Sequence, residues 1–204
     1  MKQLEVQIMG QSYLLGCPEG GESRLLEAVE RVDTAMCKIR DSNKVRARDR
    51  IAVLANGQFV QTATPEDIYM RPATLGVARL FGDPSINTVD SVIETEGGTH
   101  VVLGGTRVPV ADGYRGFGGR EVIFGVRPEA VEIGSAGVEA EVIAVTPLNE
   151  RTVLLLQTPN GWEFLASLPS SATSIPEAGA KVRASFAAAG THIFDRQTGE
   201  RLHG

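Results

Sequence analysis

The chain has 204 residues, of which 42% are hydrophobic and 22% charged, the composition of a globular protein with room for one or two domains. It contains no apolar run of about 18 residues and no apolar signal core at its start, so we expect neither membrane insertion nor secretion. Residues 1–50 hold nine Lys or Arg and eight Asp or Glu, which leaves 11 basic and 17 acidic residues, a net charge of −6, for residues 51–204. Such an acidic body argues against nucleic acid as a partner, because phosphate binding needs a basic face.

The cysteines and histidines do not form a metal-binding pattern. Cys17 and Cys37 belong to no CxxC motif, and His100, His192 and His203 are far from both in sequence. We therefore expect no metal site and no cofactor.

The first 41 residues predict a hairpin followed by a helix. Leu4, Val6 and Ile8 alternate with polar residues, the period of a half-buried strand, and residues 13–15 can return as a second strand. From about Glu22 to Asp41 the apolar residues change to spacings of four and three, which place one apolar stripe on a helix. The stripe consists of Leu25, Val29, Val32, Met36 and Ile39.

Three stretches of residues 1–55 together resemble one known family. They are VQIMGQSYLLGCP (6–18), RLLEAVERVDTAMCKIRD (24–41) and VRARDRIAVLA (45–55), which are similar to the opening hairpin, first helix and start of second helix in the head of the bacterial cell-division protein ZapA. The resemblance implies a partner of the tubulin-like division protein FtsZ that pairs its heads through a long coiled coil. Here the family's second helix would have to continue through Asn56-Gly57.

The segment around residues 48–57 fits a helix or a strand until Asn56-Gly57 is considered. The run 51–54 is too short to distinguish the two periods, but Asn-Gly strongly favours a two-residue hairpin turn. We therefore predict a strand from about Ile51 that pairs with residues 58–61. A short helix should then begin at residues 64–67, and Thr74 should cap a second one over 75–81.

From residue 86 onward the sequence predicts an all-β module. Short β-rich runs alternate with glycine-containing turns, the spacing of a small barrel or sandwich. The runs are 101–103, 107–110, 121–124, 138–145, 152–156, 162–165 and 181–186.

Three stretches of residues 49–204 resemble a second known family. They are DRIAVLANGQFVQTATPEDIYMRPATLGVARLFGDPSIN (49–87), FGVRPEAVEI (124–133) and THIFDRQTGERL (191–202), and they are similar, in this order, to the C-terminal part of MalK-type sugar-importer ATPases. The resemblance implies OB-like barrels of the transport-associated (TOBE) type, built from residues 86–133 and 138–195, and a cytoplasmic location at the inner face of the membrane. The expected fold class is α+β: a β-hairpin plus an amphipathic helix, then a mainly-β OB-like (TOBE) region. We divide the chain into 1–47 (ZapA-like partial head), 48–85 (seam and hairpin/helix remnant) and 86–204 (TOBE-like domain).

The motifs of an ATPase core are missing from the sequence. It has no GxxxxGK[ST] loop to cradle phosphates and no LSGGQ-like signature. The one glycine-rich candidate, Tyr114–Arg120, precedes a strand instead of opening a helix, so we interpret it as a loop. We expect no catalytic residues and no enzyme activity.

The segments 124–133 and 191–202, which carry the importer resemblance, supply the candidate contact residues, Arg127, Glu129, His192, Phe194 and Asp195. For Arg127 and Glu129 we favour a solvated turn in which the two side chains pair, whereas the family resemblance implies a contact in the regulatory domain or its dimer. For His192 and Asp195 we favour a structural pair beside a buried Phe194, because no nucleophile accompanies them.

Three functional hypotheses follow. The leading one is a non-catalytic regulatory or protein-interaction module related to the C-terminal region of a sugar or glycerol-phosphate importer ATPase, with a homodimer through the β domain or importer subunits as partners. The second is an adaptor that binds FtsZ through residues 1–55. The third is a barrel that binds a small oxyanion or polyol, against which the net charge of −6 weighs for an anion.

Overall fold

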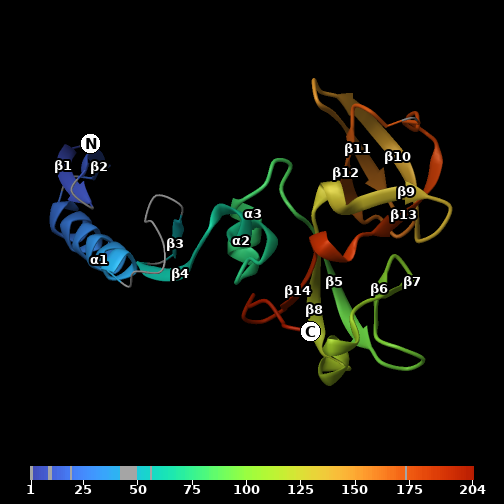
Figure 1. Ribbon diagram of the computed structural model, residues 1–204. Coiled ribbons are helices and arrows are strands. Elements are labelled where there is room, and N and C mark those ends of the chain that lie inside the picture. The colour runs from blue at the N-terminus through green and yellow to red at the C-terminus, as the bar shows by residue number, and fades with distance from the viewer. Residues whose placement is uncertain (1, 9–10, 19, 42–49, 56, 173) are drawn as a thin grey trace. The chain divides into compact units, whose positions relative to one another are not determined.

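The structure is a computed structural model that describes residues 2–8, 11–18, 20–41, 50–55, 57–172 and 174–204; of residues 2, 11 and 35–41 it describes the backbone alone. The chain forms two compact units, residues 1–65 and 66–204 (Figure 1). These units are defined by internal contacts. The three-part division at residues 47 and 85 concerns the origin of the segments and stays a prediction.

The first unit begins with an antiparallel hairpin and a helix, as predicted. Strands β1 (Lys2–Ile8) and β2 (Gln11–Cys17) pair with Leu4 opposite Leu15, and helix α1 (Glu22–Asp41) contacts β1. Val6 and Cys17 are buried. The predicted turn near Gly10 and the side chains of Met36 and Ile39 lie outside the described residues.

Residues 51–55, which the sequence alone allows to be helix or strand, form a strand, and this confirms the hairpin prediction. Strand β3 (Ile51–Ala55) pairs antiparallel with β4 (Gln58–Ala63), and Gly57 has the positive φ of 74° that such a turn requires. The rest of the segment, residues 48–49 and Asn56, lies outside the described residues. Because residues 51–55 are extended, the helix that the ZapA resemblance implies does not pass through them.

The second unit contains two short helices and two five-stranded antiparallel sheets. Helices α2 (Pro65–Met70) and α3 (Leu75–Leu80) occur where predicted, and the Thr74 hydroxyl accepts a hydrogen bond from the Val77 N–H. The first sheet has the order β14-β8-β5-β6-β7, and the second has the order β12-β11-β10-β13-β9. The bounds are β5 (Asn87–Glu94), β6 (His100–Leu103), β7 (Thr106–Pro109), β8 (Glu121–Val126), β9 (Val131–Gly134), β10 (Val138–Pro147), β11 (Arg151–Gln157), β12 (Glu163–Pro169), β13 (Lys181–Phe186) and β14 (Thr191–Asp195).

Each face of the first sheet has its own apolar packing. Inward side chains of both sheets form the main core, which includes Phe124, Phe164 and Ile193. A smaller cluster joins Leu75 and Ala78 of α3 to Phe194 of β14. The two helices therefore belong to the β module by packing.

The two sheets are also joined by a side-chain amide. Asn87 of β5 donates to the Leu165 carbonyl oxygen of β12 at 2.8 Å, and its oxygen accepts the Leu165 N–H at 2.8 Å. Because β12 is an edge strand, this amide satisfies backbone groups that would otherwise lack a partner. The second sheet curls until its edge strands β12 and β9 touch, as in an OB-like barrel. The predicted fold class, α+β with a mainly-β OB-like (TOBE) region, is confirmed.

Candidate functional site

Arg127 stands at the centre of the candidate site. It follows strand β8 directly and is 1% exposed. Its guanidinium donates from Nη1 to the Ala78 carbonyl oxygen at 2.9 Å and to that of Phe81, and from Nη2 to that of Tyr69 at 2.9 Å. A side chain at the end of a strand thus binds three backbone carbonyls from the helical segment.

These carbonyls are at the C-terminal ends of both short helices. Tyr69 lies in the last turn of α2, Ala78 lies in the last turn of α3, and Phe81 is the C-cap of α3. The last carbonyls of a helix have no partner within it, and a cation there also complements the helix dipole. One guanidinium therefore caps two six-residue helices, each too short to be stable alone.

Glu129 has a different partner from the predicted one. Its carboxylate accepts a hydrogen bond from the Tyr69 hydroxyl, and the Arg127 guanidinium stacks on the Tyr69 ring with Cζ 4.0 Å from the centroid. Burial and the Glu129 carboxylate raise the pKa of Tyr69 to about 12, while burial lowers the pKa of Arg127. The predicted solvated pair of Arg127 and Glu129 is wrong, because Arg127 is buried under Tyr69 and uses its donors on carbonyls.

Gly82 makes room for this arrangement. Its φ is +130°, and a Cβ atom at this position would lie 2.9 Å from Nη1 of Arg127. A larger residue would need a strained backbone and would push the guanidinium away from the Phe81 carbonyl.

Strand β14 separates His192 from Asp195. Successive strand residues point to opposite faces, so His192 and Phe194 face the helices while Ile193 and Asp195 lie on the other side. Phe194 is fully buried, as predicted, but the predicted His192–Asp195 pair is wrong because residues three apart in a strand cannot share a face.

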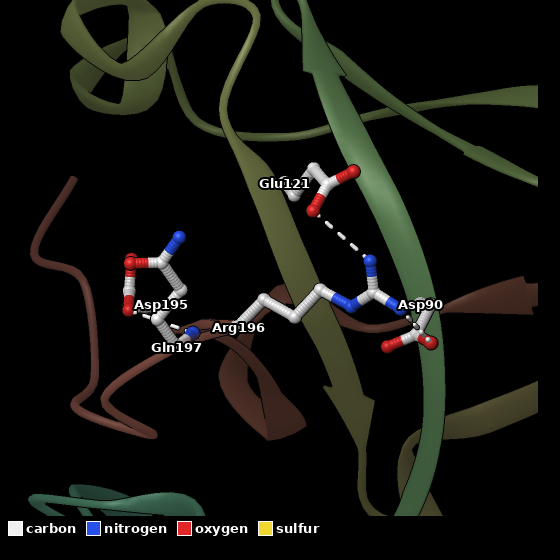
Figure 2. Close-up of polar contacts among 5 residues, drawn as sticks. All are labelled: Asp90, Glu121, Asp195, Arg196 and Gln197. Atoms are coloured by element: carbon white, nitrogen blue, oxygen red, sulfur yellow. Dashed lines mark hydrogen bonds and ion pairs between the residues drawn. The ribbon is translucent and has the colours of Figure 1, made fainter.

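Asp195 instead organises the turn that follows β14 (Figure 2). Its Oδ1 accepts the N–H groups of Gln197 at 2.9 Å and Thr198 at 2.7 Å, and its Oδ2 lies 2.7 Å from Arg120. The Thr198 backbone hydrogen bond is the main cause of a lowered Asp195 pKa.

The next residue fastens this turn to the first sheet. Figure 2 shows Arg196 reaching across to Glu121 of β8 at 3.0 Å and Asp90 of β5 at 3.2 Å. The carboxylates and the guanidinium of this group are thus engaged within the unit.

His192 is the candidate residue with an unsatisfied atom. It is 4% exposed, and within the described part of the chain its Nε2 has no hydrogen-bond partner. Burial, with smaller contributions from the positive charges of Arg201 and Arg127, lowers its pKa to about 4. His192 is therefore neutral at pH 7.

Sequence reasoning missed three residues of this neighbourhood. Tyr69, Arg196 and Arg201 all lie within the sequence stretches on which the importer resemblance rests, so the resemblance includes these positions without indicating their roles. The side-chain partners of Tyr69 and Arg196 are 60 or more residues away, and no local spacing indicates such partners.

We predict that Arg127 is the most costly cation to remove from this unit. Arg127→Ala would leave three helix-end carbonyls without a donor, and Arg127→Lys would keep the charge but lose the planar fork that reaches all three. We expect the free energy of unfolding to fall by about 3–5 kcal/mol for the alanine variant and by less for the lysine variant. Urea unfolding followed by the fluorescence of Trp162, the single tryptophan, measures this within residues 66–204.

Arg183→Ala is the matched control, because Arg183 forms an exposed pair with Glu139 and should contribute less than about 1 kcal/mol. Equal losses for Arg127→Lys and Arg183→Ala would contradict the capping role.

We predict that His192 makes the same unit less stable in mild acid. Its pKa of about 4 in the folded state lies below the ordinary value of 6.5. Between pH 4 and pH 6.5 the folded state therefore binds fewer protons than the unfolded state. The contribution of neutral His192 to the free energy of unfolding is complete above pH 6.5. It is lost as the pH falls toward 4, which lowers that free energy by up to about 3 kcal/mol. The free energy of unfolding, measured by urea unfolding at several pH values, should fall less between pH 6.5 and pH 4 for His192→Gln than for the wild type. An equal fall in the two proteins would contradict the prediction.

Comparisons with known protein families match different families on the two sides of residues 58–81, the stretch that contains the boundary between the two units. Residues 4–57 match the family described as cell division protein ZapA. Residues 82–131 match the MalK OB fold domain, and residues 124–194 match the TOBE domain.

Relatives of known sequence match the importer-like part. An uncharacterized ABC transporter ATP-binding protein, y4oS of Sinorhizobium fredii, is 34% identical over 157 residues, which are 76% of this chain and 42% of that protein. The sn-glycerol-3-phosphate import ATP-binding protein UgpC of Salmonella paratyphi A is 31% identical over 160 residues, 75% of this chain and 43% of UgpC. The chain thus spans less than half the length of these relatives, and the match covers their C-terminal region.

Among solved structures, the molybdate-binding protein ModG aligns with 52% of this chain and 94% of its own, at 17% identity and a TM-score of 0.43. The family matches and the relatives show the order of segments along the chain. A ZapA-like N-terminal segment is followed by OB-fold and TOBE segments that are similar to the C-terminal region of ABC-importer ATP-binding proteins.

Proposed function

We propose that residues 66–204 are a non-catalytic regulatory module that acts through protein–protein contacts. The observation that supports this is how the polar groups of the candidate site are used: Arg127 binds helix-end carbonyls, Asp195 binds a turn, and Arg196 bridges two carboxylates. These groups hold the module together, so they are not arranged around a reacting molecule. The resemblance to importer ATPases is confined to the C-terminal region, which favours the same conclusion.

The partners follow from the resemblance. A second copy that pairs through the β sheets, or the subunits of an importer, would supply the contacts, and the chain would then work at the inner face of the membrane. The described residues contain no helix long and apolar enough to cross a membrane. Arg127, Glu129, His192, Phe194 and Asp195 would support such contacts indirectly, because most of them are buried and fix the surface in place.

The test is ATP hydrolysis and self-association of the full chain. We expect no Mg²⁺-dependent phosphate release above the rate without protein, and a concentration-dependent dimer in sedimentation equilibrium at or below about 100 μM. Hydrolysis that co-purifies with the protein would overturn the non-catalytic assignment. A monomer at that concentration that also fails to bind purified importer subunits would overturn the interaction role.

The N-terminal unit supports a second candidate, an adaptor that binds FtsZ. Residues 4–57 match the ZapA family, and the α1 side chains of Leu25, Val29 and Val32 are only partly covered. Leu14 and Leu26 are 65% and 51% exposed. Apolar side chains that the unit leaves in water favour a protein partner.

Co-sedimentation with FtsZ polymers tests this candidate. We expect the full chain to pellet with FtsZ, and Leu14→Asp or Leu26→Asp to weaken this about tenfold, because each would place a charge in the interface. Leu80→Asp, 66% exposed in the other unit, is the matched control. The adaptor role fails if wild type does not pellet, or if the control weakens binding as much as the head variants.

A further inference from the structure

A polar recess opens between helix α2 and the start of strand β14. It has a volume of about 360 Å³, within the range of small-molecule sites. Its polar side chains come from four parts of the second unit. They are Glu66, Asp67 and Arg71 of α2, Thr191 and His192 of β14, Tyr114 of the 3-10 helix η2 (Asp112–Phe117), and Arg201 of the C-terminal segment.

The first sign of a ligand is His192. Its ring lines the recess, the residue is 96% buried, and its Nε2 finds no partner among the described residues. A buried polar atom without a partner destabilises a fold by about 1–3 kcal/mol, so such atoms are normally satisfied. A bound molecule in the recess would provide the missing hydrogen bond.

The second sign is Arg201 beside it. In the described part of the chain, no hydrogen bond or ion pair engages the Arg201 guanidinium, although its backbone N–H is held by the Ala73 carbonyl at 2.9 Å. Its charge lowers the pKa of His192 and counteracts the rise that burial causes in Tyr114, so it lies close to both. An uncommitted guanidinium next to a buried imidazole suits an anionic group.

The side of the recess that α2 forms carries carboxylates. Glu66 and Asp67 of α2 offer carboxylate oxygens, and Asp67 also lies 3.6 Å from Arg71. Carboxylates repel a bare anion but accept hydrogen bonds from hydroxyl groups. The recess is therefore positive at one end and rich in acceptors at the other.

We propose that this recess binds a small anionic polyol, with its phosphate or carboxylate at Arg201 and His192 and its hydroxyls at Glu66 and Asp67. The net charge of −6 on residues 51–204 does not oppose this, because the local charge at Arg201 decides where the anion lies. The proposal goes beyond the interaction role and does not depend on it, since the recess belongs to residues 66–204 alone.

Calorimetry of the full chain with four probes tests the proposal. We expect glycerol 3-phosphate or glycerate to bind, and comparing the two shows whether the recess prefers a phosphate or a carboxylate. Glycerol and inorganic phosphate should bind at least about tenfold more weakly, because each has only half of the recognised groups. Arg201→Gln and Glu66→Gln should each weaken the anionic polyol about tenfold. Arg183→Gln, outside the recess, should leave binding unchanged.

The side-chain nitrogen NMR signals of His192 give a second readout, since only three histidines are present. Addition of the anionic polyol that binds in calorimetry should shift the Nε2 signal of His192 and not that of His203. Three results would each overturn the proposal: no heat with either anionic polyol, phosphate binding as tightly as glycerol 3-phosphate, or unchanged affinity in Arg201→Gln.

Discussion

The guanidinium of Arg127 fixes the helical segment onto the β module, and the geometry of the whole candidate site depends on it. Two helices of six residues cannot persist by their own hydrogen bonds, because so few residues share the cost of nucleation. Arg127 satisfies the carbonyls at both helix ends at once, and Tyr69 covers the guanidinium on one side. Planar, five-donor geometry is what this site requires, which explains why an arginine and not a lysine serves here.

The beginning of helix α3 is held by the C-terminal segment of the chain. The Gly199 carbonyl accepts the Leu75 N–H, and Ala73 accepts the Arg201 N–H. The turn that presents these groups is ordered by Asp195 and tied down by Arg196. Helix α3 is thus bound at its start by the C-terminal segment, and both helices are bound at their C-terminal ends by Arg127. Helix α2, which lines the polar recess, therefore cannot shift without disturbing the contacts of Arg127.

The fold was predictable wherever a local pattern carried it. The apolar stripe of α1, the Asn-Gly hairpin and the Thr74 cap each use neighbours within a few residues, so the sequence alone was sufficient. Strands β5, β9 and β14 were not predicted. In β14, Ile193 and Phe194 are both fully buried because each faces a different apolar cluster, and this removes the alternation that reveals a strand. In β5, Asn87 is committed to the backbone of the other sheet, and an amide with that role resembles a loop residue in sequence.

The candidate site was predictable in its residues but not in its partners. Family landmarks pointed to Arg127 and His192, yet the acceptors of Arg127 are main-chain carbonyls 46 to 58 residues away, and a carbonyl belongs to every residue type. The rule that strand residues alternate would have excluded the His192–Asp195 pair once β14 was recognised. Since Arg127, Asp195 and Arg196 all find their partners within residues 66–204, the contacts that shape this module are available without the ATP-binding part of its relatives. A module held together in this way can keep its surface and its recess next to an unrelated N-terminal segment, which is the arrangement that this chain presents.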